Sequence, residues 1–401
     1  MKAVVLAAGE GKRMRPLTAT RPKEMLPIAN KPILEHLLAE FKKAGVAEFV
    51  FVVGYHDETV RDYFGDGRKW AVGIEYVTQQ EPHGTAHAVQ MVGERIDENF
   101  LLVNGDIIVT APDIDKLLSK KPPALCLIEA EDAKETGAVR VKGKRVTMIM
   151  EKAETPPSPL VNAGLYFLDK RIFAAISKTG ESVRGEYELT DALQLLIDEG
   201  TPVSYERLDH WLHVSYPWDL LTANETLLST SAGGNLGEVE AGATIKGPVS
   251  IGRGTTVRAG SYIVGPVIIG ENCEIGPNCY IRPSTAIGSG CHIGAAVEVK
   301  NSIIMRGTKL PHHNYVGDSI VGEDCNFGAG AKIANLRLDK EEIAVAGIET
   351  KRRKLGAVIG DKVEIGINVS IDVGSLIGDH SFIGPGEVVN GIILPNSRIF
   401  G

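Results

Sequence analysis

A glycine-rich loop near the start of the chain could bind a phosphate. Residues 6–16 read LAAGEGKRMRP and directly follow a short apolar run. Gly9 and Gly11 would let backbone N–H groups approach a triphosphate closely, and Arg13 offers it a forked cationic donor. The loop fits neither the Walker A pattern nor the three-glycine dinucleotide fingerprint. Taken alone, it could also be an ordinary glycine-rich turn between a strand and a helix.

Three further motifs follow this loop in the N-terminal half. They are residues 21–23 (RPK), Gln79 with residues 84–86 (GTA), and residues 104–106 (NGD) at the end of an apolar strand-like run. With the loop, they resemble in type and order the motifs of the sugar-1-phosphate nucleotidyltransferases, the uridylyl- and thymidylyltransferases that make UDP- and dTDP-sugars. The resemblance covers the whole first domain and depends on several separate motifs.

This resemblance implies roles for individual residues. The catalytic residues that hold phosphates would be Arg13 and Lys23, and the Mg²⁺ ligands would be Asp106 and Asp219. The residues that support the nucleoside or read the pyrimidine would be Ala7, Gly9, Gln79, Gly84 and Thr85. The sugar-binding positions would be Gly137, Glu151, Lys152 and Asn162.

The chemistry of nucleotidyl transfer requires such a set. A sugar 1-phosphate oxygen attacks the α-phosphorus of a nucleoside triphosphate, and pyrophosphate leaves. Because both reactants are polyanions, the enzyme must offset their repulsion and hold them in line. Two carboxylates with Mg²⁺, one arginine and one lysine can do this without a covalent intermediate.

Two alternatives stay open in this domain. Asp106 could instead be a turn aspartate that caps a helix. Residues 16–23 and Asp219 look more like the thymidylyltransferase branch of the family than like the bacterial uridylyltransferase pattern. UTP and dTTP are therefore both candidate substrates, as is more than one hexose phosphate.

Strand-like and helix-like segments alternate up to about residue 225. The strand-like segments are residues 3–6, 48–53, 100–103, 124–128, 161–167 and 203–207, and the helical ones include residues 33–44 and 188–199. This alternation predicts an α/β, Rossmann-like domain whose largely parallel sheet has helices on both faces. We expect this nucleotidyltransferase domain to span residues 1–225 and a helical linker to span residues 226–238.

Beyond the linker, aliphatic residues recur every six positions. The series runs without a miss from Val239 to Val299, returns at Val321 and resumes at Ile359. A coil of three short strands joined by tight turns gives this period, because each aliphatic side chain then stacks in a narrow triangular core. We predict a parallel β-helix of hexapeptide repeats over residues 239–401. Its resemblance to known hexapeptide β-helices implies a left-handed coil and association into a homotrimer.

The composition limits the compartment and the partners. With 401 residues, 43% of them hydrophobic and 23% charged, the chain is typical of a globular protein of two or three domains. A net charge of −8 argues against general binding to nucleic acid or membranes. The five cysteines form no CxxC pair, which indicates a reducing, cytoplasmic environment. We interpret four of them as small core residues of the β-helix, namely Cys273, Cys279, Cys291 and Cys325.

Two interruptions of the six-residue period mark candidate functional positions. The register breaks at residues 305–315, and an insertion occupies about residues 335–357. Residues around them resemble, in order and spacing, the acetyltransferase site of the bacterial bifunctional enzymes that convert glucosamine 1-phosphate to UDP-N-acetylglucosamine. This resemblance implies that His312 is the general base and that Asn326 helps to place the amine. The residues implied to bind the sugar phosphate or lie beside it are Arg282, Lys300, Tyr315 and Asn335.

General acid–base chemistry supports the role of the histidine. An amine attacks an acetyl thioester only when it is unprotonated, and a histidine that titrates near neutrality can remove its proton. The backbone around Ala329 could supply an oxyanion donor. The basic run at residues 351–354, with Lys351 and Arg352, either binds the phosphates of coenzyme A or is a solvated loop.

The leading hypothesis is a bifunctional enzyme that acetylates an amino-sugar 1-phosphate and joins the sugar phosphate to a nucleotide, with Mg²⁺ as cofactor and acetyl-CoA as co-substrate. One alternative is a single-function hexose-1-phosphate nucleotidyltransferase whose β-helix serves trimerisation or regulation. Another is a scaffold without catalysis. The bifunctional hypothesis is favoured because Arg282, Lys300, His312 and Asn326 occur together on the predicted β-helix.

Overall fold

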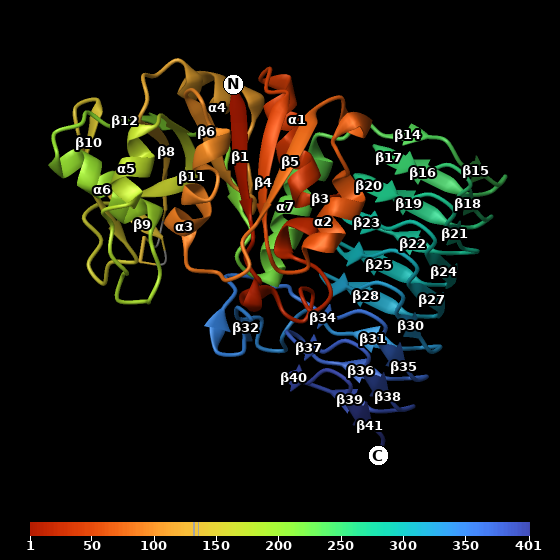
Figure 1. Cartoon of the computed structure of the whole chain (residues 1–401). Coiled ribbons are helices and arrows are strands. Elements are labelled where there is room, and N and C mark those ends of the chain that lie inside the picture. The colour runs from red at the N-terminus through yellow and green to blue at the C-terminus, as the bar shows by residue number, and fades with distance from the viewer. Residues whose placement is uncertain (131–132, 135) are drawn as a thin grey trace. The chain divides into compact units, whose positions relative to one another are not determined.

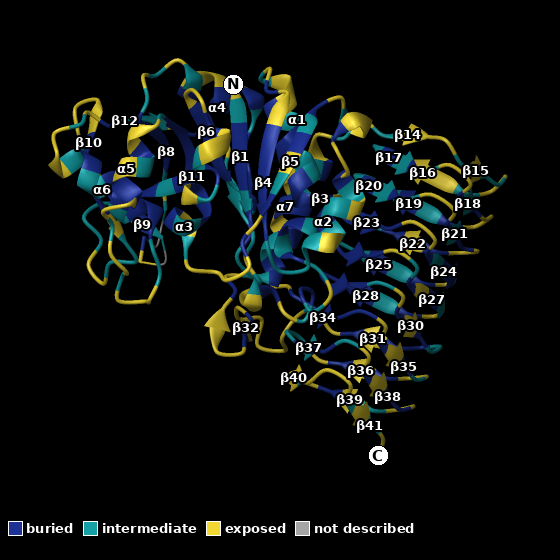
Figure 2. Ribbon diagram, viewed as in Figure 1, coloured by how far each residue is buried: buried dark blue, intermediate teal, exposed yellow. Residues whose placement is uncertain are grey.

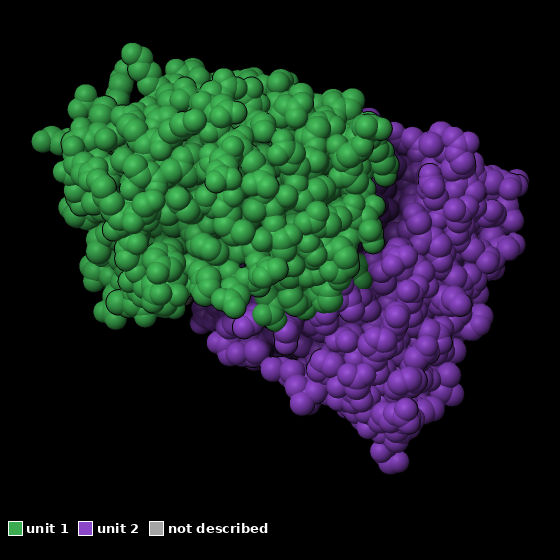
Figure 3. Space-filling view, in the orientation of Figure 1, with its two compact units in different colours: residues 1–10, 21–25, 33–213 green, residues 11–20, 26–32, 214–401 purple. Residues whose placement is uncertain are grey.

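The contacts of the chain divide it into two compact units. The structure is a computed structural model that describes residues 1–130, 133–134 and 136–401. Unit 1 comprises residues 1–10, 21–25 and 33–213, and unit 2 comprises residues 11–20, 26–32 and 214–401 (Figure 3). The glycine-rich loop thus begins in unit 1 and continues, from Gly11 onward, as part of unit 2.

A mixed β-sheet forms the centre of unit 1. In spatial order its strands are β5 (Gly73–Thr78), β4 (Glu48–Val53), β1 (Lys2–Ala7), β6 (Phe100–Asn104), β11 (Leu160–Leu168), β8 (Ala124–Glu129), β12 (Ser204–Arg207), β10 (Arg145–Glu151) and β9 (Gly137–Lys142). The strands from β5 to β6 run parallel, whereas β11 is antiparallel to β6 and β8, and β9 is antiparallel to β10. The expectation of a largely parallel sheet is therefore wrong for most of the second half, although β12 runs parallel to β8. The turn that joins β9 to β10 is too short for the crossover that a parallel pair needs.

Helices cover both faces of this sheet, which confirms that part of the prediction (Figure 1). One face packs on α1 (Ile33–Lys43), α2 (Asp57–Phe64) and α4 (Ala111–Leu118), and the other on α3 (Thr85–Gln90), α5 (Arg171–Ile176) and α6 (Leu189–Asp198). Strand β1 shows the division, because Ala3 and Val5 belong to the first core and Val4 to the second. Figure 2 shows the strands between these helices as a buried layer.

Shorter elements complete unit 1 and begin unit 2. In unit 1, β7 (Ile107–Ile108) pairs with β13 (Leu212–His213), and the 3₁₀ helices are η2 (Lys23–Met25), η3 (Arg68–Trp70) and η4 (Gly93–Arg95). Unit 2 contains η1 (Lys12–Met14), the hairpin of β2 (Pro27–Ile28) and β3 (Lys31–Pro32), and α7 (Pro217–Ser229). Among the residues described, no helix is both long and apolar enough to cross a membrane.

The rest of unit 2 is a three-sided coil of parallel strands. All of residues 234–401 are described, and every turn of the coil adds strands to three sheets. The first sheet consists of β14 (Gly234–Asn235), β17 (Val249–Ile251), β20 (Val267–Ile269), β23 (Thr285–Ile287), β26 (Ile303–Ile304), β29 (Ile320–Val321), β34 (Val358–Ile359), β37 (Leu376–Ile377) and β40 (Ile392–Ile393). The second consists of β15 (Glu238–Val239), β18 (Thr256–Val257), β21 (Glu274–Ile275), β24 (His292–Ala295), β27 (Lys309–His312), β30 (Asn326–Phe327), β35 (Glu364–Ile365), β38 (Phe382–Ile383) and β41 (Arg398–Ile399). The third consists of β16 (Thr244–Lys246), β19 (Tyr262–Val264), β22 (Tyr280–Ile281), β25 (Glu298–Lys300), β28 (Tyr315–Gly317), β31 (Lys332–Ile333), β36 (Ser370–Ile371) and β39 (Val388–Val389).

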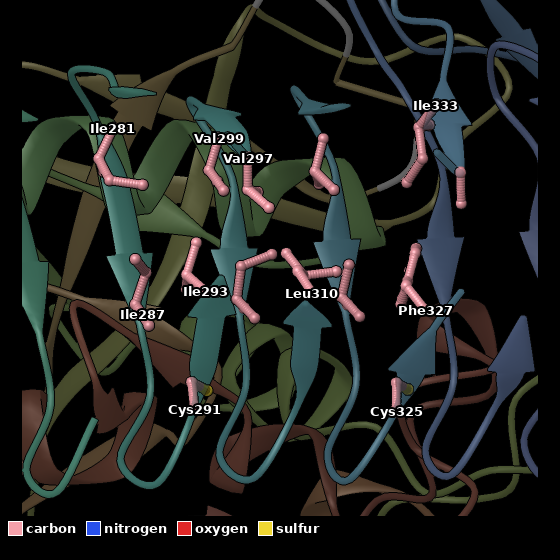
Figure 4. Close-up of a cluster of buried hydrophobic side chains, with 14 of the residues drawn as sticks. Ile281, Ile287, Cys291, Ile293, Val297, Val299, Leu310, Cys325, Phe327 and Ile333 are labelled. Carbon is pink, nitrogen blue, oxygen red and sulfur yellow. The ribbon is translucent and has the colours of Figure 1, made fainter. Parts of the chain in front are cut away.

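This arrangement is that of a parallel β-helix, and its first strand, β14, lies within the segment expected as linker. From Ile251 to Val389, the residues of the six-residue series point into the coil and form one continuous core. Figure 4 shows Ile281, Ile287, Ile293 and Val299 side by side in this core, with Leu310 from the next turn. Thus the repeat specifies the core as predicted.

The coil is not interrupted at residues 305–315, which corrects the expected register break. Ile293 pairs with Leu310 and Val299 with Val316 in the regular parallel ladder. The inward residue after Val299 is Ile304, and the one after Val316 is Val321, so these two sides are five residues long instead of six. A corner that is shorter by one residue shifts the sequence period while the strands above and below stay paired.

The second interruption is a true insertion. Residues between β31 and β34 leave the coil and form the hairpin of β32 (Ala344–Val345) and β33 (Ile348–Glu349). The coil then resumes with Val321 paired to Ile359. The insertion therefore extends from the coil without breaking its stack, as the sequence predicts.

The four cysteines of the β-helix are buried core residues, which confirms their interpretation. Figure 4 shows Cys291 and Cys325 at the edge of the aliphatic core. The thiol of Cys279 donates a hydrogen bond to the carbonyl of Gly294 at 2.8 Å. Burial raises the pKa of Cys325 to about 12, so the reactive thiolate is strongly disfavoured there.

The core predicts that two isoleucines of the six-residue series contribute differently to the free energy of unfolding. Ile293 is fully buried in the middle of the coil, whereas Ile245 lies on the first turn and is 37% exposed. Ile293→Ala should lower the free energy of unfolding by about 2–5 kcal/mol, because it leaves a cavity in a close-packed core. Ile245→Ala should cost less than about 1 kcal/mol, since less apolar surface is lost. Urea unfolding followed by circular dichroism compares them, and equal costs would contradict the stacked-core account.

Candidate active sites

The parallel half of the sheet in unit 1 has its polar motifs at one edge. Strand order reverses at β1, which lies between β4 and β6, and ligands of open α/β sheets bind beyond the carboxyl ends of strands at such a point. Ala7 ends β1, and the space beside Gly9 is open within 4 Å. At the end of β4, a Cβ on Gly54 would lie 2.8 Å from the carbonyl oxygens of Ala8 and Gln79. The loops after β1, β4 and β5 therefore approach one another closely.

Lys23 and Asp106 form an ion pair at this edge. The Nζ atom of Lys23, on η2, lies 2.5 Å from Oδ2 of Asp106, directly after β6. The β7–β13 pairing places Nε2 of His213 3.4 Å from the same oxygen. Burial alone would raise the pKa of Asp106, but the charges of Lys23 and His213 outweigh it and hold the pKa well below its usual range. Asp106 is therefore an ionised carboxylate, and it fixes the position of the Lys23 ammonium.

The other carboxylate oxygen of Asp106 suits a cation. Its Oδ1 is buried and, among the described residues, has no hydrogen-bond partner. Oε2 of Glu24 is in the same condition, and burial raises the pKa of Glu24 to about 7. The described residues contain no group of three or more His, Cys, Asp or Glu side chains that could enclose a metal. Mg²⁺ commonly binds through one or two carboxylates, with water and substrate phosphates as its other ligands, so Asp106 fits such an ion.

The motif expected to read the pyrimidine is anchored to α6. Gln79 is buried, and its Nε2 lies 2.9 Å from Nδ1 of His87, a residue that the sequence did not single out. Gly84 has φ +99°, and a Cβ there would lie 2.5 Å from the carbonyl oxygen of Tyr187. The Oγ1 of Thr85 accepts the N–H of Leu189 at 3.0 Å. Thr85 thus connects the first turns of α3 and α6.

Three of the predicted sugar-binding positions lie together. Gly137 and Glu151 are partners in the β9–β10 ladder, and a Cβ on Gly137 would lie 2.9 Å from Oε2 of Glu151 and 3.5 Å from Cβ of Asn162. Burial, followed by the charge of Glu188, raises the pKa of Glu151. Lys152 follows with a left-handed φ of 46°. These residues form a polar group on the antiparallel half of the sheet.

Arg13 and Asp219 belong to unit 2. The guanidinium carbon of Arg13 lies 5.6 Å from the centre of the Tyr216 ring, a cation–π contact. Asp219 caps α7, because its Oδ2 accepts the N–H groups of Ser215 at 2.8 Å and Tyr216 at 2.7 Å. The capping interpretation that the sequence left open for Asp106 thus describes Asp219, whose role as a metal ligand stays a prediction.

The four residues predicted to bind the phosphate of the amino sugar, or to lie beside it, belong to the third sheet of the β-helix or follow its strands. They are called the acetyl-acceptor group, because the amino sugar would accept the acetyl group. Arg282 and Lys300 follow paired residues of β22 and β25, so they are equivalent positions on successive turns. Arg282 forms an ion pair of 2.9 Å with Glu298. Tyr315 and Asn335 crowd Gly317, where a Cβ would lie 2.6 Å from the Tyr315 hydroxyl and 2.7 Å from Nδ2 of Asn335. Burial, then the charges of Glu298 and Asp318, raise the pKa of Tyr315.

His312 and Asn326 lie on the second sheet instead. His312 ends β27 with an exposed side chain, and Asn326 on β30 donates from Nδ2 to Glu364 at 3.0 Å. The loop that contains Ala329 is joined to His312, whose carbonyl accepts the N–H of Gly330 at 3.0 Å. The structure therefore places the predicted base, His312, beside the predicted oxyanion loop. The residues predicted to bind the phosphate lie on another sheet of the coil.

Arg352, in the basic run of the insertion, contacts other side chains of unit 2, and its role toward coenzyme A stays a prediction. Its side chain is only 17% exposed and forms an ion pair of 2.7 Å with Glu225 of α7. Its Nη1 also donates to Thr222 at 2.9 Å. Lys351, with a left-handed φ of 55°, is exposed. Arg352 thus anchors the insertion to α7.

Two family descriptions match the chain. "Nucleotidyl transferase" matches residues 2–230, and "GMPPB C-terminal domain" matches residues 263–366. A crystal structure of a Bacillus anthracis protein described as a glucose-1-phosphate thymidylyltransferase has a TM-score of 0.53 at 24% identity. It covers 59% of this chain and 98% of its own, and so supports the fold of the first domain.

Relatives match from end to end. The bifunctional protein GlmU of Methanocaldococcus jannaschii is 41% identical, and that of Methanococcus maripaludis is 44% identical; each alignment covers 100% of this chain and 97% of the relative. A bifunctional sugar-1-phosphate nucleotidylyltransferase/acetyltransferase of Sulfurisphaera tokodaii is 40% identical over 97% of both chains. The chain therefore belongs to the nucleotidyl transferase family, among its bifunctional sugar-1-phosphate nucleotidylyltransferase/acetyltransferase members.

Proposed function

We propose that this protein makes a nucleotide sugar by two transfers. One moves an acetyl group from acetyl-CoA to an amino-sugar 1-phosphate, with glucosamine 1-phosphate as the preferred candidate. The other moves a uridylyl or thymidylyl group from UTP or dTTP to the sugar 1-phosphate and releases pyrophosphate. The observation that carries this proposal is that one chain, similar over its whole length to bifunctional relatives, has separate cation–carboxylate sites on its α/β sheet and on its β-helix.

In nucleotidyl transfer, the chain's own residues position two polyanions. Lys23 and Arg13 hold phosphate oxygens, and Lys23 does so with an ammonium that Asp106 already keeps in place. Gln79, Gly84 and Thr85 contact the base, and the group around Glu151 and Asn162 binds the sugar. Asp106 would hold Mg²⁺, which when bound offsets the charge of the phosphates. Asp219 is the proposed second carboxylate.

In acetyl transfer, Arg282 and Lys300 hold the sugar phosphate and Asn326 helps to place the amine. The neutral amine attacks the thioester carbonyl, and the C–S bond breaks as the amide forms. His312 takes up the amine proton and passes it to the departing sulfur, so that coenzyme A leaves as the thiol. Backbone N–H groups near Ala329 would stabilise the oxyanion. Lys351 would contact a phosphate of coenzyme A. We further propose a left-handed coil, a homotrimer formed through it and a cytoplasmic location, in which the buried free cysteines would stay reduced.

A product assay tests the two activities together. The purified protein is incubated with Mg²⁺, glucosamine 1-phosphate and either UTP or dTTP, with and without acetyl-CoA, and the products are identified by mass spectrometry. We expect an N-acetylated nucleotide sugar only when acetyl-CoA is present. Nucleotide sugar without any acetyl transfer would support the single-function alternative, and coenzyme A release that does not require the amino sugar would contradict the second activity.

Loss of the Lys23 ammonium should damage nucleotidyl transfer selectively. Lys23→Ala should lower turnover by at least about 10²-fold, the scale for removing one preorganised electrostatic group. The control is Lys116→Ala, since Lys116 is exposed and pairs with Asp209 away from the motifs. Pyrophosphorolysis of the nucleotide sugar measures both variants, and near-normal rates in Lys23→Ala would refute the assignment.

His312 should be required only for acetyl transfer. His312→Asn removes the proposed base and should slow coenzyme A release by at least about 10²-fold, the scale for losing general base catalysis. His313→Asn is a matched control, because His313 is adjacent and exposed. Nucleotidyl transfer should be unchanged in both variants. If His312→Asn abolished both activities, the two sites would not be separable as proposed.

A further inference from the structure

A buried carboxylate that the sequence did not single out lies at the centre of the acetyl-acceptor group. Asp318 follows β28 and is only 2% exposed. Its Oδ2 accepts a hydrogen bond from Nζ of Lys300 at 2.8 Å and another from Nδ2 of Asn335. Its Oδ1 accepts from Nδ2 of Asn301 at 2.8 Å. The Asp318 carboxylate therefore receives three donors, two from adjacent residues of one turn and one from Asn335 further along the coil.

The contacts continue from Asp318 to α7. Nδ2 of Asn301 also donates to Oε1 of Glu225 at 2.9 Å. The same Glu225 oxygen accepts from Arg352, which anchors the insertion. All of these residues belong to unit 2. Hydrogen bonds through Asn301 and Glu225 therefore connect the carboxylate of Asp318 to helix α7 and to the insertion.

We propose that Asp318 is the positioning residue of the acetyl-acceptor site, and that it fixes the Lys300 ammonium and the Asn335 amide for the phosphate of the amino sugar. This inference rests on the proposed acetyl transfer. Asp318 does not contact the reacting atoms. It acts through Lys300, with Asn301 and Glu225 setting its own orientation.

The two cations of the site differ in how firmly they are held. Arg282 and Glu298 are each about one-third exposed, and such pairs restrict a side chain weakly. The side chain of Lys300 is 18% exposed and the side chain of Asp318 only 3%. A lysine has four flexible bonds and three donors, so one bond to Asp318 fixes the ammonium and leaves two donors for phosphate oxygens. Lys300 is therefore the preorganised contact of the two.

The backbone offers a matched control for substitution. Asp318 has a left-handed φ of 49°, and Asp324, one corner further along the coil, has a φ of 53°. Asp324 is exposed and lies near Arg306 instead of Lys300. Alanine at either position introduces the same backbone strain. Only at position 318 would it release a phosphate-binding lysine.

Kinetics of acetyl transfer separate positioning from a merely structural role. Asp318→Ala should raise the KM for glucosamine 1-phosphate roughly tenfold, the effect of losing one well-placed charge-assisted contact, with kcat within about threefold of wild type. The KM for acetyl-CoA and the rate of nucleotidyl transfer should not change. Asp324→Ala should leave all of these constants unchanged. A fall in kcat at constant KM, with a lower melting temperature, would mean that Asp318 is only structural.

A conservative variant adds a rescue test. Asp318→Asn keeps an oxygen that accepts from Lys300 and Asn335, and it loses only the bond from Asn301, whose Nδ2 donates to Oδ1 of Asp318. Its KM should therefore lie within about threefold of wild type. A KM as high as that of Asp318→Ala would contradict the positioning role.

Calorimetric titration keeps this inference distinguishable from the proposed function. Glucosamine 1-phosphate should bind the wild type about tenfold more tightly than Asp318→Ala and as tightly as Asp324→Ala. If the wild type failed to acetylate but showed this difference, the proposed activity would fall and the positioning role would stand. Equal binding by all three proteins, or no binding to any, would overturn the positioning role.

Discussion

The main physical constraint on this protein is that a chain with a net charge of −8 must bind polyanionic phosphates. The overall field repels them, so each site depends on cations held in place locally. At the proposed sites, the structure pairs such cations with carboxylates. The pairs are Lys23 with Asp106, Arg282 with Glu298, and Lys300 with Asp318. The two less exposed pairs, those of Lys23 and Lys300, hold their ammonium groups in place most firmly.

These ion pairs also account for the further hydrogen bonds around them. A buried ion pair is favourable only when its geometry is good and further hydrogen bonds satisfy both partners. Around Asp318 these bonds come from Asn301 and Asn335. Asp106 keeps one oxygen without a partner among the described residues, so its site is satisfied only in part by the protein itself. The described residues thus satisfy both carboxylate oxygens of Asp318 but only one of those of Asp106.

Much of the fold could be predicted because it depends on local periodicity. The six-residue repeat specifies which residues point inward, and the strands and helices of unit 1 follow apolar patterns. The five-residue sides after Val299 and Val316 could not be predicted, because a shortened corner looks like a lost register in the sequence. The antiparallel placement of β11 depends on tertiary pairing and not on its own residues.

Some residues of the candidate sites could likewise be identified from the sequence, and others could not. Lys23 and Asp106 stand in recognisable motifs, and the structure places them 2.5 Å apart. Asp318 and Glu24 carry no motif that the sequence singled out, since their importance comes from what burial and distant partners do to a carboxylate. Arg352 likewise has a contact that the sequence does not reveal, because its guanidinium pairs with Glu225 of a distant helix.

The β-helix unit also includes part of the glycine-rich loop that is proposed to bind the nucleotide. The segments at residues 11–20 and 26–32 belong to unit 2, and their contacts show why. Thr20 donates to Asp361 at 2.7 Å, Asn30 donates to the carbonyl of Ile287 at 2.7 Å, and the buried Asn224 bonds both Ala29 and Ser284. Because Arg13 lies in the first of these segments, the backbone that presents it depends on the coil. The β-helix unit therefore contains Arg13 of the proposed nucleotidyl-transfer residues together with the contacts that hold its segment.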